Sequence, residues 1–77
     1  MTQQFSQDEQ KVARCLNQAH DRDKVGLSFP EVIKCARISR SRVKAALSAL
    51  VAREVVTSEE HKAFILYYVK NRIEVKS

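Results

Sequence analysis

Glycine and proline are almost missing from this chain, which holds one residue of each among its 77. Long irregular segments depend on these two residues for their turns, so the connections between secondary-structure elements must be short. No apolar run approaches the roughly 20 residues that a helix needs to cross a bilayer. The N-terminal stretch MTQQFSQDEQK contains no apolar signal segment. We therefore expect a cytoplasmic protein that does not associate with membranes.

The scarcity of glycine also excludes several kinds of catalytic site. A single Gly can form neither a phosphate-cradling loop nor a dinucleotide fingerprint. His20 and His61 have no Cys or acidic neighbour at metal-ligand spacing. Asp21 and Asp23 lie in a polar stretch, where turn formation is their expected role. We predict no enzyme activity, no cofactor and no metal site.

Cysteine is limited to Cys15 and Cys35, both inside predicted helices. A disulfide framework would need more bridges and an oxidising compartment. The spacing of the two residues also matches no zinc motif. We therefore predict two reduced and mostly buried thiols.

The length of the chain predicts one domain over residues 1–77. Such a small chain hides only roughly 60% of its unfolded surface, so its core is modest and dimerisation would help to stabilise it. We place the core at about residues 6–69. Residues 70–77 are expected to form a flexible tail or a short extra strand.

The net charge of +5 is concentrated in the middle third of the chain. Residues 28–54 contain six basic and two acidic side chains, which gives +4, whereas residues 1–27 net zero and residues 55–77 net +1. A local basic patch attracts polyanions and releases their counterions. The alternative is a basic helix face that is merely solvated.

Hydroxyl residues mark the starts of three predicted helices. Ser6 and Ser28 each precede a Glu at capping-box spacing, which predicts helices over 7–21 and about 29–36. Ser39 precedes a third, over about 40–53. Apolar side chains recur at helical spacing in all three, at Val12, Cys15, Leu16 and Ala19, at Phe29, Val32, Ile33 and Ala36, and at Val43, Ala46, Leu47, Leu50 and Val51. The turn between the second and third helices is so short that they must cross sharply, as in a helix-turn-helix.

The hydrophobic pattern changes its period after the third helix. Residues 55–57 and 63–69 are rich in strand-forming residues, and the polar residues 58–62 separate them. The two segments predict a hairpin whose second strand is apolar on both faces. That strand is expected to be covered on both sides or to join a dimer interface. The predicted fold class is mainly α with a small β-hairpin.

Three helices followed by a hairpin, with a basic third helix, resemble the winged helix-turn-helix family of bacterial transcriptional regulators. The resemblance covers about residues 6–69 and is carried by SFPEVIKCARISRSRVKAALSALVAREVV. It implies that the third helix enters the major groove of DNA and that the hairpin, or wing, touches the adjacent backbone. The family often has Gly where this chain has Arg37 and Glu54, so the two turns are expected to differ from the family's. The wing tip also carries Glu59 and Glu60, which would repel phosphate unless the wing points away from the duplex.

The outer face of the third helix supplies the predicted site. Arginine can donate two parallel hydrogen bonds to guanine, which gives about 1–3 kcal/mol of discrimination, and an alanine methyl can touch the thymine methyl. Serine hydroxyls and lysine suit phosphate. Helical spacing and proximity select as DNA-binding residues Lys34, Arg37, Arg40, Ser41, Arg42, Lys44, Ala45 and Ser48.

Two functions remain open from the sequence. The first is a regulator that binds double-stranded DNA, as a homodimer, because one recognition helix contacts only a few base pairs. The second is a winged-helix adaptor that binds another protein through the wing or through residues 63–69.

Overall fold

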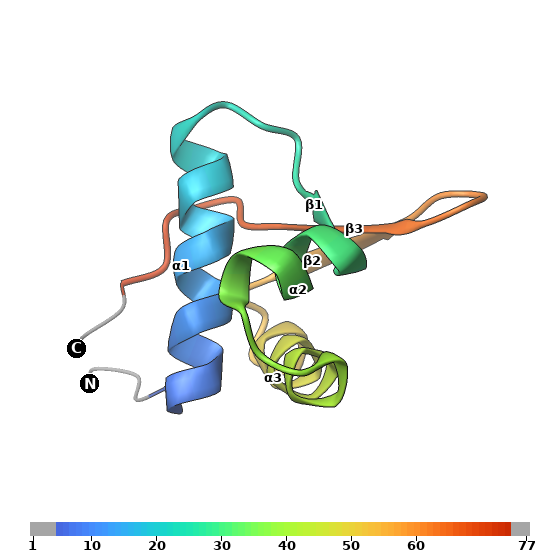
Figure 1. The fold of residues 1–77 in the computed structure, drawn as a ribbon. Coiled ribbons are helices and arrows are strands. Elements are labelled where there is room, and N and C mark those ends of the chain that lie inside the picture. The colour runs from blue at the N-terminus through green and yellow to red at the C-terminus, as the bar shows by residue number, and fades with distance from the viewer. Residues whose placement is uncertain (1–4, 75–77) are drawn as a thin grey trace.

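The computed structural model describes residues 5–74, which form three helices and a small antiparallel sheet. The elements are α1 (Gln7–Asp21), β1 (Leu27–Ser28), α2 (Phe29–Ala36), α3 (Arg40–Ala52), β2 (Thr57–Glu60) and β3 (Ile65–Tyr68). Figure 1 shows the β2–β3 hairpin projecting well beyond the three helices. The predicted fold class, mainly α with a hairpin wing, is confirmed. The predicted bounds of the first two helices also match, and the third ends one residue early.

The predicted apolar stripes of the helices meet in one core. The largest fully buried side chains come from all three helices: Leu16, Leu50, Val12, Val32 and Val43. Phe29, Ile33 and Val51 are only partly buried and pack against this core from its edge. The shared core fixes the crossing of α2 and α3, and hence the direction in which the outer face of α3 points.

The predicted serine caps are present. The Ser6 hydroxyl accepts a hydrogen bond from the Glu9 amide at 3.2 Å, and the Glu9 carboxylate accepts one from the Ser6 amide at 2.8 Å. At α2 the Glu31 carboxylate accepts hydrogen bonds from both the amide and the hydroxyl of Ser28, each at 3.0 Å. These bonds lower the pKa of Glu31, because they stabilise its ionised form. The helices therefore begin where the Ser-x-x-Glu pattern predicts.

All three helices end in a left-handed residue that is not glycine. The residues are Asp23, Arg37 and Glu54, with φ of 57°, 59° and 62°. After α3, the amide of Glu54 donates to the carbonyl of Val51 and that of Val55 to Leu50, which is the bonding of a Schellman motif. Arg37 and Glu54 therefore take the backbone conformation that Gly favours, although both carry side chains. The helix-ending hydrogen bonds impose the left-handed conformation despite its cost of about 1–2 kcal/mol per residue.

Replacing Glu54 by Gly should raise the free energy of unfolding by about 0.5–1 kcal/mol, because Gly removes the left-handed strain but adds backbone entropy to the unfolded chain. Urea unfolding measures the change. Ala52→Gly, two residues earlier in helical conformation, is the matched control and should lower the free energy of unfolding by about 1 kcal/mol. A destabilising Glu54→Gly would show that the residue is not strained.

The sheet contains a strand that the sequence pattern did not predict. β1 pairs with β3, with Leu27 opposite Tyr67, so that the strand order is β1-β3-β2. A Cβ on Gly26 would lie 2.8 Å from the carbonyl oxygen of Tyr67, so only Gly allows the chain to approach β3 this closely. β2 starts at Thr57 and includes Ser58–Glu60, which the sequence assigned to the polar break. Its polar residues were misassigned because they belong to an exposed edge strand.

A disulfide joins Cys15 of α1 to Cys35 of α2, so the prediction of two reduced thiols is wrong. The packing of α1 against α2 brings the two Cα atoms to 6.1 Å, within the range that a disulfide spans. Cys15 is buried, as predicted, but Cys35 is exposed. A separation of 20 residues along the chain says nothing about this tertiary contact, and therefore the sequence did not reveal it.

The chain after β3 returns to α1. The Asn17 side chain donates to the carbonyl of Ile73 and accepts from its amide, both at 2.8 Å, and Ile73 is buried. Arg72 also pairs with Asp21. The predicted flexible tail is therefore wrong at Arg72 and Ile73, which contact α1, and residues 70–74 form no strand. Residues 75–77 lie outside the described residues. Across residues 5–74, no helix has the length and apolarity required to cross a membrane.

Candidate nucleic-acid interface

The outer face of α3 is open to solvent over its first three turns. Every residue that the sequence assigned to this face is exposed: Arg40, Ser41, Arg42, Lys44, Ala45 and Ser48. The stripe on the other side is buried in the core, so rotation of the helix cannot hide this face. Ser39 caps the helix, because its hydroxyl accepts a hydrogen bond from the Arg42 amide at 3.3 Å. The start of α3 is therefore fixed in position by its own cap and by the core below it.

Arg40 and Lys44 lie beside a groove that separates α3 from the wing. The groove has a volume of about 1160 Å³, and its walls come from α2, the start of α3 and β3. The Arg40 guanidinium lies over the Phe29 ring, 5.4 Å from its centroid. Such a cation–π contact orients the guanidinium while leaving its N–H groups available in the plane of the group. Arg40 is thus held at the rim of the groove by an aromatic platform from α2.

Arg42 is engaged by a carboxylate of its own domain. Its Nε donates to Oδ2 of Asp8 at 2.9 Å, and a second guanidinium nitrogen donates to Oδ1. These hydrogen bonds hold the pKa of Asp8 below its ordinary value and raise the pKa of Arg42. The side chain of Arg42 still exposes 54% of its surface. Asp8 thus occupies two of the five N–H donors of Arg42 and competes with phosphate for its charge.

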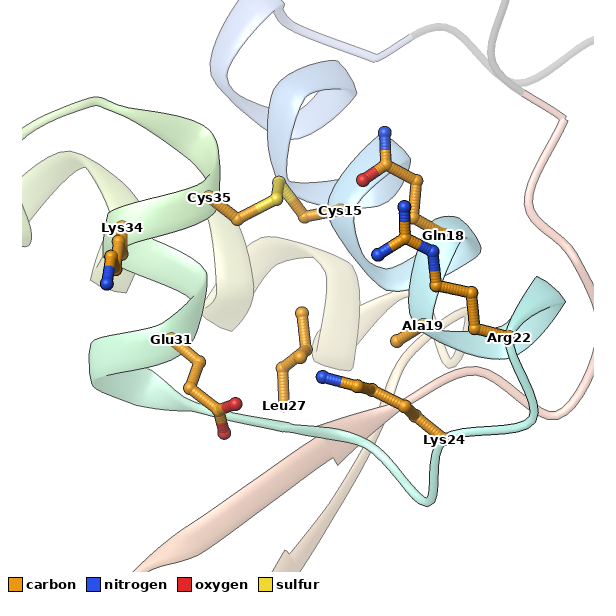
Figure 2. Close-up of a pocket in the computed structure, with 9 residues that line it drawn as sticks. All are labelled: Cys15, Gln18, Ala19, Arg22, Lys24, Leu27, Glu31, Lys34 and Cys35. Atoms are coloured by element: carbon orange, nitrogen blue, oxygen red, sulfur yellow. A yellow bond between two sulfur atoms is a disulfide. The ribbon is translucent and has the colours of Figure 1, made fainter.

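The remaining predicted cations lie on two different surfaces. Arg37 is exposed in the turn between α2 and α3, next to the start of the predicted interface. Lys34 instead lines a smaller pocket between α1 and α2, together with the Cys15–Cys35 disulfide (Figure 2). The structure therefore gathers Arg40, Lys44 and the small residues of α3 on one face and places Lys34 elsewhere.

The wing tip is acidic and partly aromatic. Glu59 lies 3.5 Å from His61, and the His61 ring stacks on Phe64 with centroids 4.8 Å apart. Phe64 exposes 48% of its surface and Ile65 exposes 37%. The expectation that the second strand of the hairpin is covered on both sides is therefore wrong. Within the described part of the chain, no group of three or more His, Cys, Asp or Glu could hold a metal ion.

Two contacts of the interface have no local sequence signal. Asp8 lies 34 residues before Arg42, and Phe29 belongs to a different helix from Arg40. From the sequence, Asp8 could be recognised only as a residue that stabilises the start of a helix, because acidic residues favour the first turn of any helix. Both contacts arise from how the helices pack, and therefore only the tertiary structure reveals them.

The described residues thus combine three helices, a projecting hairpin and an exposed basic face on the third helix. No protein-family model matches the chain, and no curated protein matches its sequence. Among solved structures, the fold is similar to that of BpsR from Bordetella bronchiseptica, whose DNA binding is regulated by 6-hydroxynicotinic acid. The TM-score is 0.74 and the identity 19%, over 90% of this chain and 51% of the BpsR chain. This chain therefore spans about half the length of BpsR, and the similarity shows a common fold.

Proposed function

We propose that the protein is a DNA-binding transcriptional regulator of the winged helix-turn-helix family and that α3 enters the major groove. The observation that carries the proposal is the open face of α3, on which every predicted contact residue is exposed while the opposite stripe is buried. The fold shared with BpsR, a protein that binds DNA, supports it.

Each side chain of the face has a distinct role in this proposal. Arg40, whose guanidinium lies over the Phe29 ring, presents paired donors to a guanine edge. Lys44 and the hydroxyls of Ser41 and Ser48 contact phosphate. The small side chain of Ala45 lets the middle of α3 approach the bases closely. A dimer would place two such helices on successive half-sites and so multiply the specificity.

Titration of a mixed-sequence duplex at several salt concentrations tests the proposal. Fluorescence anisotropy gives the association constant at each concentration. Its logarithm should fall linearly with the logarithm of salt, with a slope of about −0.9 for each phosphate contacted. Binding that is absent or independent of salt would contradict a DNA-binding function.

Asp8→Asn should tighten DNA binding about threefold, because the variant removes a carboxylate that competes with phosphate for an exposed arginine. Asp23→Asn, which removes the same charge from the turn after α1, is the control and should leave the affinity within error. Because Arg42 lowers the pKa of Asp8, the carboxylate remains ionised in mild acid. The effect should thus be the same between about pH 5 and pH 7. Equal affinities of the two variants would mean that Arg42 does not contact DNA.

The second candidate function, a protein-binding adaptor, is favoured by the wing. Its tip carries Glu59 and Glu60 beside the exposed Phe64 and Ile65, a combination suited to a protein partner rather than to phosphate. In this alternative the groove between α3 and the wing is the docking surface.

Replacing Glu59 and Glu60 together by Gln tests whether the wing lies along the DNA or points away from it. If the wing lies along the DNA backbone, loss of two like charges should tighten DNA binding about threefold to tenfold at low salt. Unchanged affinity, measured in the same titration, would place the wing away from the duplex. Asp23→Asn combined with Glu74→Gln, which removes two carboxylates outside the wing, controls for net charge.

A further inference from the structure

We propose that the Cys15–Cys35 disulfide is a thiol-exchange site, at which a small anionic thiol forms a mixed disulfide with Cys35. The inference concerns the pocket between α1 and α2 and does not depend on DNA binding. Three features carry it: the access of solvent to one sulfur, the cations around the pocket, and the position of the bond in the fold.

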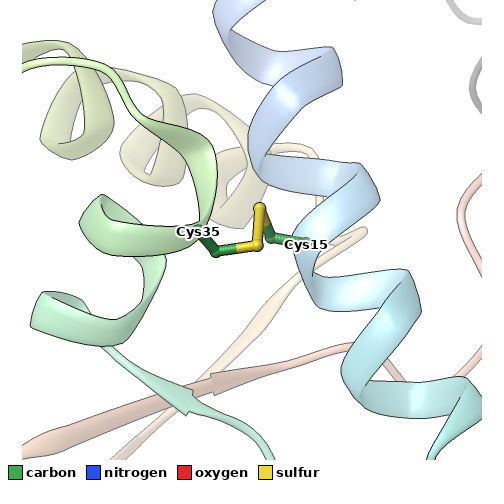
Figure 3. Close-up of a disulfide and its surroundings, with 2 residues drawn as sticks. All are labelled: Cys15 and Cys35. Carbon is green, nitrogen blue, oxygen red and sulfur yellow. A yellow bond between two sulfur atoms is a disulfide. The ribbon is translucent and has the colours of Figure 1, made fainter.

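The two cysteine residues differ in exposure. Cys15 exposes only 5% of its surface, whereas Cys35 is exposed on α2. Figure 3 shows the bond spanning the gap between the two helices. Thiol–disulfide exchange requires the attacking thiolate to reach one sulfur directly, so access decides which sulfur is attacked. We therefore place the attack at Cys35, the more exposed of the two residues, with Cys15 as the leaving group.

The disulfide forms part of the wall of a pocket of about 310 Å³. Arg22 and Lys24 border this pocket from the end of α1 and the following loop, and Lys34 borders it from α2. In Figure 2 the Lys24 side chain extends across toward α2, and the Arg22 side chain runs along α1 toward Gln18. The only acidic group of the lining, Glu31, is already hydrogen-bonded to Ser28. A surplus of two positive charges in a concave site concentrates anions.

The same cations favour the chemistry of exchange. A thiolate, not a thiol, attacks the disulfide, and a neighbouring cation stabilises both the incoming and the departing thiolate. Low-molecular-weight thiols that carry two carboxylates also match the charge of the pocket. The class of ligand that fits is therefore an anionic aliphatic thiol small enough for this volume.

The proposed reaction has two steps. In the first, the thiolate forms a bond to Sγ of Cys35, the Sγ–Sγ bond breaks, and Cys15 leaves as a thiolate that takes a proton from solvent. In the second, another molecule of the same thiol attacks the mixed disulfide and releases the Cys35 thiolate together with the symmetric disulfide of the small thiol. The two thiol molecules supply the two electrons that reduce the protein disulfide.

The bond connects α1 to the last turn of α2, two residues before Arg37 and the turn into α3. Disulfides that occur in reducing compartments are mostly transient. An accessible bond beside the helix-turn-helix could thus report the thiol balance around the protein.

The test uses the full oxidised chain with three probes: glutathione, which is anionic, 2-mercaptoethanol, which is neutral, and cysteamine, which is cationic. Exchange is quenched with acid, and intact mass and peptide mapping give its rate and site. The rates are divided by those measured for the same chain unfolded in urea, which removes the intrinsic reactivity of each thiol. We expect the corrected rate to be about tenfold higher for glutathione than for cysteamine and the adduct to lie on Cys35.

Arg22→Gln combined with Lys24→Gln should lower the glutathione rate about fivefold and leave the 2-mercaptoethanol rate unchanged. Lys62→Gln combined with Lys70→Gln, which removes two cations outside the pocket, is the matched control. The proposal is overturned if the folded chain forms no adduct, if the adduct lies on Cys15, or if the three probes react at equal corrected rates. It is also overturned if the purified chain keeps two free thiols after oxidation.

Discussion

Replacing Arg40 and Lys44 together by Ala should weaken binding to duplex DNA about a hundredfold, because one bidentate base contact and one phosphate contact are lost. The salt slope should become shallower by about one unit, because one phosphate contact is lost. Anisotropy titrations of the double variant and the original protein, at matched salt, measure both quantities. This is the largest effect on binding that we expect from the described residues.

The large effect follows from how the two side chains are held. Arg40 is already oriented by Phe29, so little conformational entropy remains to be lost when it meets a base. Lys44 follows one helical turn later and extends the same exposed face along the groove. Neither residue has its charge occupied by a carboxylate in the described structure, in contrast with Arg42. From the sequence, Arg40 was expected on the outer face and Arg42 beside the apolar stripe, and both were expected to bind DNA. The contact with Asp8 is a further reason to separate them.

Arg14→Ala combined with Lys70→Ala is the matched control for this prediction. Both cations are exposed, and they lie on α1 and just after β3, outside the face of α3. Their loss removes the same charge but should weaken binding only about twofold to threefold, through the general field of the protein. Circular dichroism should show that both double variants retain the fold. If the two double variants lost equal affinity, the face of α3 would not be the DNA-binding surface.

The helices could be predicted from the sequence because their signals are local. Ser6, Ser28 and Ser39 each mark a start, and the apolar stripes at helical spacing mark the faces that meet in the core. The exposed face of α3 follows from the same spacing, since a helix with one buried stripe must expose the other. Local rules of capping and amphipathicity therefore determined most of the fold and the candidate face.

The features that the sequence did not predict are tertiary. β1 has only two residues and exists because it pairs with β3, and Ile73 is fixed because Asn17 reaches its backbone. The left-handed turns at Arg37 and Glu54 are imposed by helix-ending hydrogen bonds rather than by residue preference. The disulfide, like the Asp8–Arg42 pair, depends on the packing of helices that are distant in sequence. None of these contacts produces a repeating pattern of residue types that could be recognised in one sequence.

Reducing the Cys15–Cys35 disulfide should lower the free energy of unfolding by about 3 kcal/mol. The bond closes a loop between residues 20 apart, and in the chain-entropy model a loop of this length restricts the unfolded state by roughly that amount. A chain of 77 residues has a total stability of roughly 4–12 kcal/mol, so the bond accounts for a large share. We expect the melting temperature to fall by about 15 °C.

Urea and thermal unfolding with and without a reductant measure this effect. The native core should remain, because Val12, Leu16 and Val32 pack α1 against α2 independently of the bond. The variant with both cysteines replaced by Ser is the control: it should unfold at the midpoint of the reduced protein, and the reductant should not shift it further. A reduced protein as stable as the oxidised one would mean that helix packing alone holds α1 to α2. In that case the bond would open without changing the position of α3.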